Sequence, residues 1–354
     1  MPNLRNGIYA HSFLYIAVTL LTLGASLFPA SLVAETINIE PASRHPNIDY
    51  LTMDDGIRLR WALWPPSPPV RGTVVLLNGR AEFIEKYQEQ AEDWSKRGYQ
   101  TFSLDWRGQG LSDRELSNRQ KSHIDNYTRY VADLDQFLKK IVFQTSKDNR
   151  RVLFAHSMGS LIALHYLLKN PDAFQAIILS SPMIDIITDP WPRWAAEMMA
   201  RYAIAFGFAT SYAFSQDDYD PTTNAQFIDN VLTSDPTRFA QHHQMLRANS
   251  NLRLGGVTFG WLVASFRAGA LLTFADRLNR ITSPILMISS PDDRLTPADA
   301  HESLCRRLQH CTYKAYSGGR HELMRETDVI RARVWEDIDG FLDWAQDSSR
   351  RQWK

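Results

Sequence analysis

The sequence has little cysteine and no excess of charge of either sign. Only 2 of its 354 residues are cysteines, and lysine plus arginine equal aspartate plus glutamate at 39 each. Nucleic-acid-binding domains usually carry a basic excess, so the composition does not favour that class. Two cysteines without a suitable histidine partner do not predict a zinc site, and no repeat or low-complexity tract is present. The 44% of hydrophobic residues is enough for a large buried core.

The first 34 residues differ from the rest because they are almost free of charge. Arg5 precedes an apolar centre at residues 13–23, and a region of small residues follows Gly24. This order is typical of a secretory signal, but an uncleaved segment of this length is also just long enough to anchor the chain in a bilayer. We therefore expect residues 1–34 to be a signal peptide or an N-terminal membrane anchor. The chain is then exported, either to a bacterial periplasm or to the inner membrane facing it.

The two cysteines, Cys305 and Cys311, are only six positions apart. In an exported protein such a pair can close a small disulfide loop, whereas in a cytosolic protein the two side chains would remain thiols. The sequence leaves both states open.

From residue 48 onward, short apolar runs alternate with helical patterns. Residues 35–47 are predicted to be a linker. A parallel sheet with crossover helices on both faces produces this alternation, so we predict an α/β fold with a mostly parallel eight-stranded sheet. The predicted strands are residues 48–53, 57–63, 73–77, 100–104, 151–154, 176–180, 285–289 and 312–316. Asp55-Gly56 is predicted to be the hairpin turn between the first two.

Residues 183–275 interrupt the alternation and contain no convincing core strand. We predict that they form a helical cap, inserted into a core built from residues 48–182 and 276–347. Ligands bind outside the carboxyl ends of the strands in such sheets, so the cap would cover the site. The segment is rich in aromatic residues and methionine. We expect most of these to form the core of the cap and the rest to line a substrate wall.

The segment Ala155-His156-Ser157-Met158-Gly159 follows a predicted strand and opens a predicted helix. In this context a serine flanked by small residues indicates a nucleophile elbow, a sharp turn that exposes the serine hydroxyl. Ala155 stands where the motif usually has glycine. A serine hydroxyl is a poor nucleophile at neutral pH and needs a base and a group that orients the base.

Asp293 and His321 are the predicted partners of Ser157. Each follows a predicted strand, so both are expected at the same edge of the sheet as the serine, in the chain order Ser, Asp, His. Asp292 is the competing candidate for the acid. His156 is expected to point away from the tip of the elbow, and the remaining histidines are expected to be structural or at the surface.

The reaction also needs hydrogen-bond donors for the developing oxyanion. The backbone N–H groups of Met158 and Arg80 are the predicted donors, because they follow the nucleophile and the strand at residues 73–77. For the Arg80 side chain, a salt bridge to Glu82 or Glu85 is the expected contact, with a substrate phosphate as the alternative.

These motifs resemble the monoglyceride lipase and lysophospholipase group of α/β-hydrolases, which includes enzymes named serine aminopeptidases. The resemblance covers roughly residues 48–345, and the NGRxE form is closest to bacterial lysophospholipase L2-type members. The chain departs from the common pattern at Asn78, where many members have histidine, and at Ala155. The matching segments are NGRAEFIEKY, DWRGQGLSD, AHSMGS, SPDDRLTP and GGRHELMRE, with LTSDPTRF and LGGVTFGWL in the cap.

The resemblance implies hydrolysis of a single-chain lipid ester, a lysophospholipid or a monoacylglycerol, without a metal or cofactor. A short-chain carboxylesterase and an acyltransferase use the same residues and stay open as alternatives. A non-catalytic binding protein on the same fold is a third class, against which the complete Ser, Asp and His set argues. The expected partners are a lipid or small ester and a membrane surface, with no nucleic acid.

Overall fold

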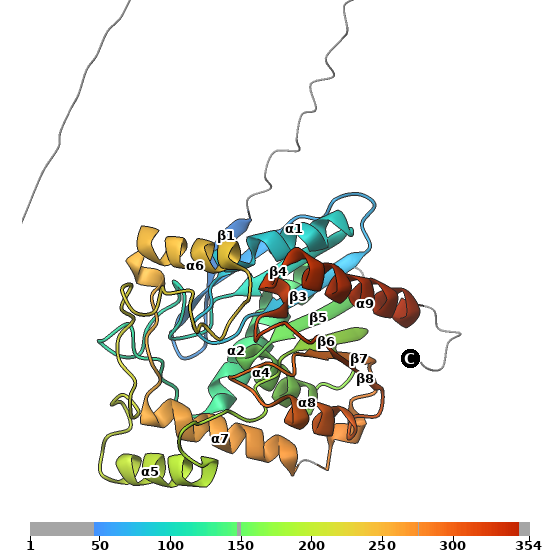
Figure 1. Ribbon diagram of the computed structural model, residues 1–354. Coiled ribbons are helices and arrows are strands. Elements are labelled where there is room, and N and C mark those ends of the chain that lie inside the picture. The colour runs from blue at the N-terminus through green and yellow to red at the C-terminus, as the bar shows by residue number, and fades with distance from the viewer. Residues whose placement is uncertain (1–45, 147–149, 275, 347–354) are drawn as a thin grey trace, which may run out of the picture. The chain divides into compact units, whose positions relative to one another are not determined.

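A computed structural model describes residues 46–146, 150–274 and 276–346 (Figure 1). The predicted signal peptide or anchor at residues 1–34 and nearly all of the predicted linker at 35–47 lie outside this part of the chain. Within it, no helix has both the length and the apolar character that crossing a membrane requires.

The eight predicted strands form one sheet, in the order β1-β2-β4-β3-β5-β6-β7-β8. The strands β3 to β8 run parallel to one another, whereas β2 pairs antiparallel with both β1 and β4. The prediction of a mostly parallel eight-stranded sheet is therefore confirmed. The strands are β1 (Asn47–Thr52), β2 (Arg58–Trp64), β3 (Gly72–Leu77), β4 (Tyr99–Leu104), β5 (Arg151–His156), β6 (Ala176–Ser180), β7 (Ile285–Ser289) and β8 (Cys311–Ala315).

The central strands are continuous apolar runs because both of their faces are covered. Every residue of β3, β6 and β7 is buried, as expected of parallel strands between two helix layers. At the edge, the β1–β2 hairpin turns at Gly56, whose φ of 86° suits glycine. Its amide donates to Met53 O.

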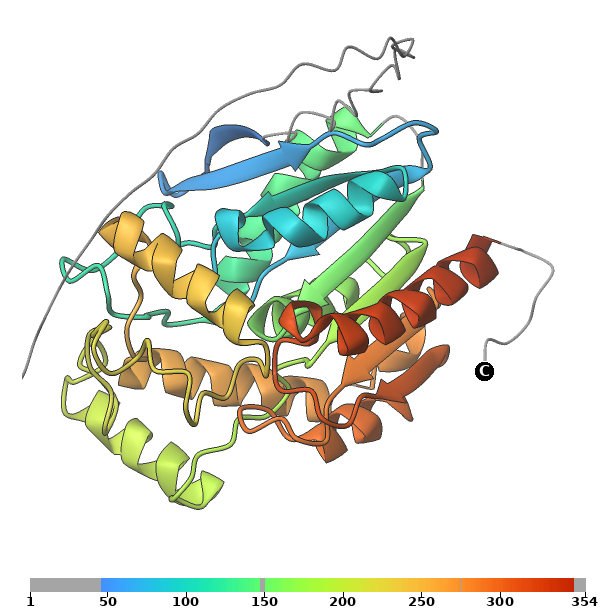
Figure 2. The ribbon, with the colours of Figure 1, turned by 45° about the horizontal axis from the view of Figure 1, so that its top comes forward.

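Helices cover both faces of the sheet and give it two apolar cores. One core packs under α1 (Gln88–Lys96) and α9 (Asp328–Gln346), which lie in front of the sheet in Figure 2. There the Trp94 and Trp335 rings meet edge to face with centroids 4.8 Å apart. The other core packs under α2 (Tyr127–Phe137), α4 (Met158–Leu167) and α8 (Ala298–Cys305).

Two helices of the core are irregular at one end. The helix α1 is preceded by a 3₁₀ turn, η1 (Ile84–Tyr87). The helix α2 begins where Asn126 caps the amide of Thr128. It then continues as a π-helical turn, η2 (Leu138–Val142), and a last turn, α3 (Phe143–Thr145).

Between β6 and β7 the structure has helices where the cap is predicted. They are α5 (Arg193–Ala205), α6 (Pro236–Ala248) and α7 (Phe259–Thr273), with a short 3₁₀ turn, η3 (Ser250–Leu252). The helices α6 and α7 begin at strong caps, because Asp235 and Thr258 accept hydrogen bonds from amides of the first turn. Two further 3₁₀ turns lie outside the predicted cap, η4 (Leu278–Arg280) and η5 (Leu323–Arg325).

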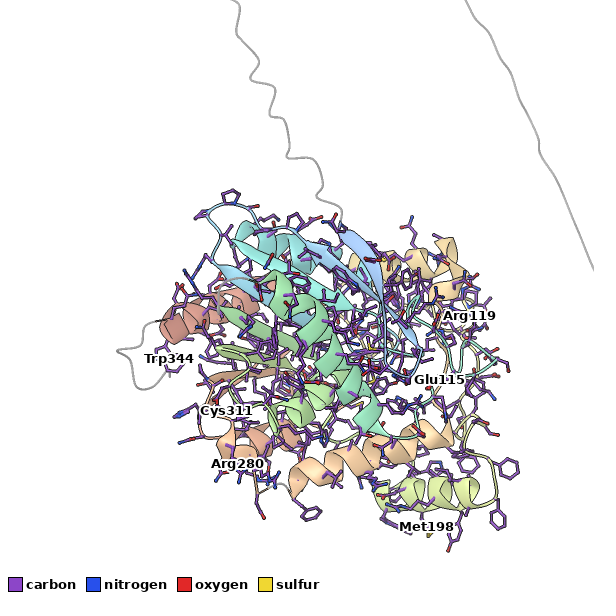
Figure 3. All side chains as sticks on the ribbon, turned by 180° about the vertical axis from the view of Figure 1, so that it is seen from behind. Glu115, Arg119, Met198, Arg280, Cys311 and Trp344 are labelled. Atoms are coloured by element: carbon purple, nitrogen blue, oxygen red, sulfur yellow. A yellow bond between two sulfur atoms is a disulfide. The ribbon has the colours of Figure 1, made fainter. Side chains whose placement is uncertain are left out.

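The expectation that most aromatic residues of this segment form its core is wrong. Trp261 and Phe266 are buried, but a larger group is exposed, including Met198 at the outer side of α5 (Figure 3). The reason is that α5 packs on α7 by its other face, through residues such as Ala200. The exposed members are Trp191, Trp194, Met198, Tyr202, Phe206, Phe208 and Phe214.

Cys305 and Cys311 form a disulfide, with their Cα atoms 5.4 Å apart. It joins the last residue of α8 to the first residue of β8. The structure thereby selects one of the two states that the sequence leaves open.

Gly159 provides a stability test of the β5–α4 turn. A Cβ atom there would lie 2.6 Å from the carbonyl oxygens of both Leu77 and Asn78, and backbone atoms cannot move away as a side chain can. We expect Gly159→Ala to lower the free energy of unfolding by about 3 kcal/mol or more in urea denaturation. Gly207→Ala is the control, because Gly207 has a φ of 88° but no atom within 4 Å of a Cβ, and its strain costs about 1 kcal/mol. Equal losses would contradict the steric explanation.

Candidate active site

Ser157 lies at a strained turn between β5 and α4. Its φ of 50° and ψ of −116° are unusual for a residue other than glycine, and its amide is held by Ser180 O at 2.9 Å. Such strain persists only where surrounding structure fixes the backbone. Ala155 fits within β5, where it pairs with Leu77 and Leu179. Alanine in place of the usual glycine thus leaves the turn intact.

The structure brings the three predicted triad residues into one hydrogen-bonded chain. His321 Nε2 lies 2.9 Å from Ser157 Oγ, and His321 Nδ1 lies 2.7 Å from Asp293 Oδ2. The three residues come from the loops after β5, β7 and β8, because the carboxyl ends of parallel strands share one edge of the sheet. All three side chains are buried. This is the geometry in which a histidine removes a proton from a serine while a carboxylate fixes its tautomer.

The carboxylate of Asp293 is held in its charged form. Burial alone would raise its pKa, but hydrogen bonds from His321, from the amide of Leu295 and from the hydroxyl of Thr296 leave the pKa well below its usual value. Asp292 lies elsewhere, since its Oδ2 accepts from the amide of Gly318 at 2.8 Å. The contacts thus distinguish the two neighbouring aspartates.

The backbone of His321 is fixed by contacts outside the triad. Its carbonyl accepts a hydrogen bond from Ser181 Oγ at 2.9 Å. The amide of the next residue, Glu322, donates to Leu232 O of the predicted cap at 2.8 Å. The position of the predicted base therefore depends on both β6 and the cap.

The two predicted oxyanion donors, the amides of Met158 and Arg80, lie just after β5 and β3 in the chain. Met158 is the first residue of α4, so its amide has no partner one turn earlier in the helix. Arg80 follows β3 and lines the same cavity as Ser157. Its neighbours Gly79 and Ala81 donate their amides to Glu82 and Gln109. Across the described ranges, no hydrogen bond uses the amide of Arg80.

The expected salt bridge from Arg80 to Glu82 or Glu85 is not formed. Arg80 Nη1 instead donates to Gly255 O at 2.9 Å, and the guanidinium lies 5.9 Å from the centre of the Trp261 ring. The reason is that Glu82 and Glu85 have other cationic partners, Lys86 and Arg60.

A buried ionic cluster that we did not anticipate lies next to the triad. Lys86 Nζ contacts Glu82 Oε1 at 2.7 Å and Glu322 Oε1 at 2.6 Å, and Tyr87 OH donates to Glu82. Burial would raise the pKa of Glu82, but the charge of Lys86 and the hydrogen bonds from Lys86 and Tyr87 hold it far below its usual value. The i,i+4 spacing of Glu82 and Lys86 was the available signal, whereas nothing local indicated Glu322.

Two histidines also lie closer to the site than expected. His156 packs against His321 with ring centroids 4.8 Å apart, so it does not point away. His156 and His242 of α6 both line the cavity. Burial lowers the pKa of both imidazoles, which favours their neutral forms.

Ser157 opens into a cavity of about 460 Å³, which falls within the range of small-molecule sites. Its lining includes Ser157 and His321 of the triad and the Glu82–Lys86–Glu322 cluster. The lining residues from the predicted cap are mainly apolar and include Met183, Ile187, Trp191, Met199, Phe214, Phe259, Trp261 and Leu262. A site of this kind can accept an ester whose acyl part is a hydrocarbon.

Fold and site together define a serine hydrolase of the α/β-hydrolase class. The model of the family described as serine aminopeptidase, S33, matches residues 68–328, and the chain belongs to this family. The resemblance stated from the motifs is thereby confirmed.

Similar proteins include named lipid hydrolases. A probable lysophospholipase L2 of Haemophilus influenzae is 30% identical over 83% of this chain and 91% of that protein. Lysophospholipase L2 of Escherichia coli K12 is 29% identical over 76% and 80% of the two chains. A monoacylglycerol lipase of Mycolicibacterium smegmatis is 25% identical over 81% and 93%.

Solved structures show the same fold. A soluble variant of the monoglyceride lipase of Saccharomyces cerevisiae, crystallised with a substrate analogue, has a TM-score of 0.66 and 21% sequence identity, and the match covers 87% of this chain and 99% of that one.

The two neighbouring aspartates provide a matched test of the triad. We expect Asp293→Asn to lower kcat for p-nitrophenyl butyrate by ~10⁴-fold, because the imidazole would then be held in the wrong tautomer. Asp292→Asn, which loses only the contact with Gly318, should keep a kcat close to that of the wild type. Equal losses in the two variants would contradict the assignment of Asp293.

Proposed function

We propose that the chain hydrolyses carboxylic esters of single-chain lipids, lysophospholipids or monoacylglycerols, through a covalent acyl-enzyme. The observation that carries the proposal is the hydrogen-bonded chain from Ser157 through His321 to Asp293, which opens into a cavity with an apolar wall. The names of the similar proteins from Haemophilus, Escherichia and Mycolicibacterium support the same substrate class.

The proposed chemistry follows from the positions of these groups. Ser157 Oγ attacks the acyl carbonyl while His321 Nε2 takes its proton. The amides of Arg80 and Met158 stabilise the resulting oxyanion, where one such donor typically contributes about 3–4 kcal/mol. His321 then protonates the leaving alcohol. Water, activated by the same imidazole, releases the fatty acid from Ser157.

The wall of the cavity supports a lipid rather than a short acyl chain. Trp191, Met199, Phe259 and Leu262 of the predicted cap line the same cavity as Ser157, and each buried methylene contributes about 0.8 kcal/mol. A long acyl chain therefore gains binding energy that an acetyl group cannot.

Acyl-chain length is the direct test of this substrate class. We expect kcat/KM of the wild type to rise with chain length from butyryl to lauroyl or longer in a series of monoacylglycerols and lysophosphatidylcholines. Ser157→Ala should abolish all of these activities. A wild type that cleaves acetyl and butyryl esters but no lipid would be a short-chain carboxylesterase, and the lipid proposal would fail.

We also propose that the chain is exported. The Cys305–Cys311 disulfide supports this localisation, because such bonds persist mainly in oxidising compartments. In a Gram-negative host, we expect the full chain in the periplasm or on the inner membrane, with the disulfide formed. A chain that lacks residues 1–34 should stay in the cytoplasm with both thiols accessible to alkylation. Recovery of the full chain only from the cytoplasm would refute export.

A further inference from the structure

The guanidinium of Arg80 is a cation at the candidate active site without a carboxylate partner. Arg80 lines the same cavity as Ser157, and among the described residues no aspartate or glutamate lies within salt-bridge distance of its guanidinium. Its recorded contacts are Gly255 O, at 2.9 Å, and the Trp261 ring.

Two other buried cations among the described residues contact carboxylates. Arg107 contacts Asp133 at 2.6 Å and Asp55 at 2.7 Å. Lys86, in the same cavity as Arg80, is shared by Glu82 and Glu322. Arg80 differs from these two cations, because among the described residues none of its contacts is with a carboxylate.

Holding this charge in place has a cost. Arg80 is half-buried, and burial lowers the pKa of its guanidinium, an effect that Tyr127 and Tyr130 only partly oppose. A guanidinium carries five N–H donors in a planar fork, and the contact with Gly255 uses one Nη atom. Its remaining nitrogens are not among the buried atoms without a partner. They are therefore at least partly accessible and can accept a further partner.

We propose that the Arg80 guanidinium receives the phosphodiester of a lysophospholipid head group and makes the site selective for phosphate-bearing lipids over neutral monoacylglycerols. This inference rests on the proposed function. The planar fork suits phosphate oxygens, while Gly255 O and the Trp261 ring fix its orientation.

The order of the groups in a lysophospholipid corresponds to the order of the groups in Arg80. In a lysophospholipid a glycerol unit separates the ester carbonyl from the phosphate. In Arg80 an aliphatic stem separates the backbone amide, the proposed oxyanion donor, from the guanidinium. One residue then contacts the reacting carbonyl and the head group of the same molecule, and so couples head-group recognition to the position of the ester.

The experiment compares the binding of two non-hydrolysable ether lipids with the same alkyl chain, below their critical micelle concentrations. One is a 1-O-alkyl-lysophosphatidylcholine and the other is a 1-O-alkylglycerol. Isothermal titration calorimetry gives the ratio of their dissociation constants for the wild type and for Arg80→Met, which keeps an apolar stem. We expect the preference for the phospholipid to fall by about tenfold to a hundredfold in this variant, the range typical of a charged hydrogen-bonded contact.

Two further variants make the result specific. Arg80→Lys keeps the charge without the fork and should keep part of the preference, and it is also the variant used if Arg80→Met does not fold. Arg253→Gln is the matched control, because Arg253 lies two residues from Gly255, forms none of the observed salt bridges and does not line the cavity. It should leave the ratio unchanged.

The outcomes separate this inference from the proposed function. If Arg80→Met weakens both lipids equally, or the wild type shows no preference, the phosphate site is refuted, even when the wild type hydrolyses lysophospholipid. If the preference depends on Arg80 but the wild type hydrolyses neither lipid ester, the anion site stands and the lipase proposal fails. If inorganic phosphate binds through Arg80 while the lipid ratio does not change, the site is one for free phosphate, and the head-group assignment is wrong.

Discussion

The hydrogen bond between His321 Nε2 and Ser157 Oγ is the contact on which the candidate site depends. Its two atoms belong to residues 164 positions apart, at 2.9 Å. Because β5, β7 and β8 run in the same direction, the loops that follow these strands lie at one edge of the sheet. A hydrogen bond tolerates errors of a few tenths of an ångström, so the sheet must be rigid. The continuous apolar strands and the two helix layers provide that rigidity.

The buried ionic cluster supports the same arrangement from the other side. Lys86 follows β3, and Glu322 follows the predicted base directly, so their 2.6 Å contact ties the loop of the oxyanion donor to the loop of the base. A buried ion pair gives little net stability, because desolvation opposes the attraction between the charges. Loss of one partner, however, would leave an uncompensated charge beside the triad. We therefore consider the cluster a device that fixes the position of the two loops rather than a source of stability.

Much of this fold and site could be predicted from the sequence. Residues 73–77 and 285–289 are apolar runs of strand length, and the small residues around Ser157 fit only a sharp strand-to-helix turn. The chain order of Ser157, Asp293 and His321 then placed three side chains at one sheet edge. The roles of these residues stay predictions, but their proximity is a result of the structure.

Long-range side-chain contacts could not be predicted, because no local pattern encodes them. The pairing of Lys86 with Glu322 joins residues 236 positions apart. The direction of the Arg80 side chain towards Gly255 depends on which nearby carboxylates already have cationic partners. The exposed aromatic residues of α5 were misassigned because helical spacing indicates an apolar face but not what covers it. His156 was misplaced because the strained φ and ψ of Ser157 change the direction of its neighbours.

Labelling with a fluorophosphonate probe shows whether the folded protein activates Ser157, since the reagent reacts with an activated serine and needs no knowledge of the substrate. We expect labelling of the native wild type, none of Ser157→Ala, and none of the heat-denatured wild type. A folded wild type that does not label, or a Ser157→Ala variant that labels as strongly as the wild type, would contradict this activation.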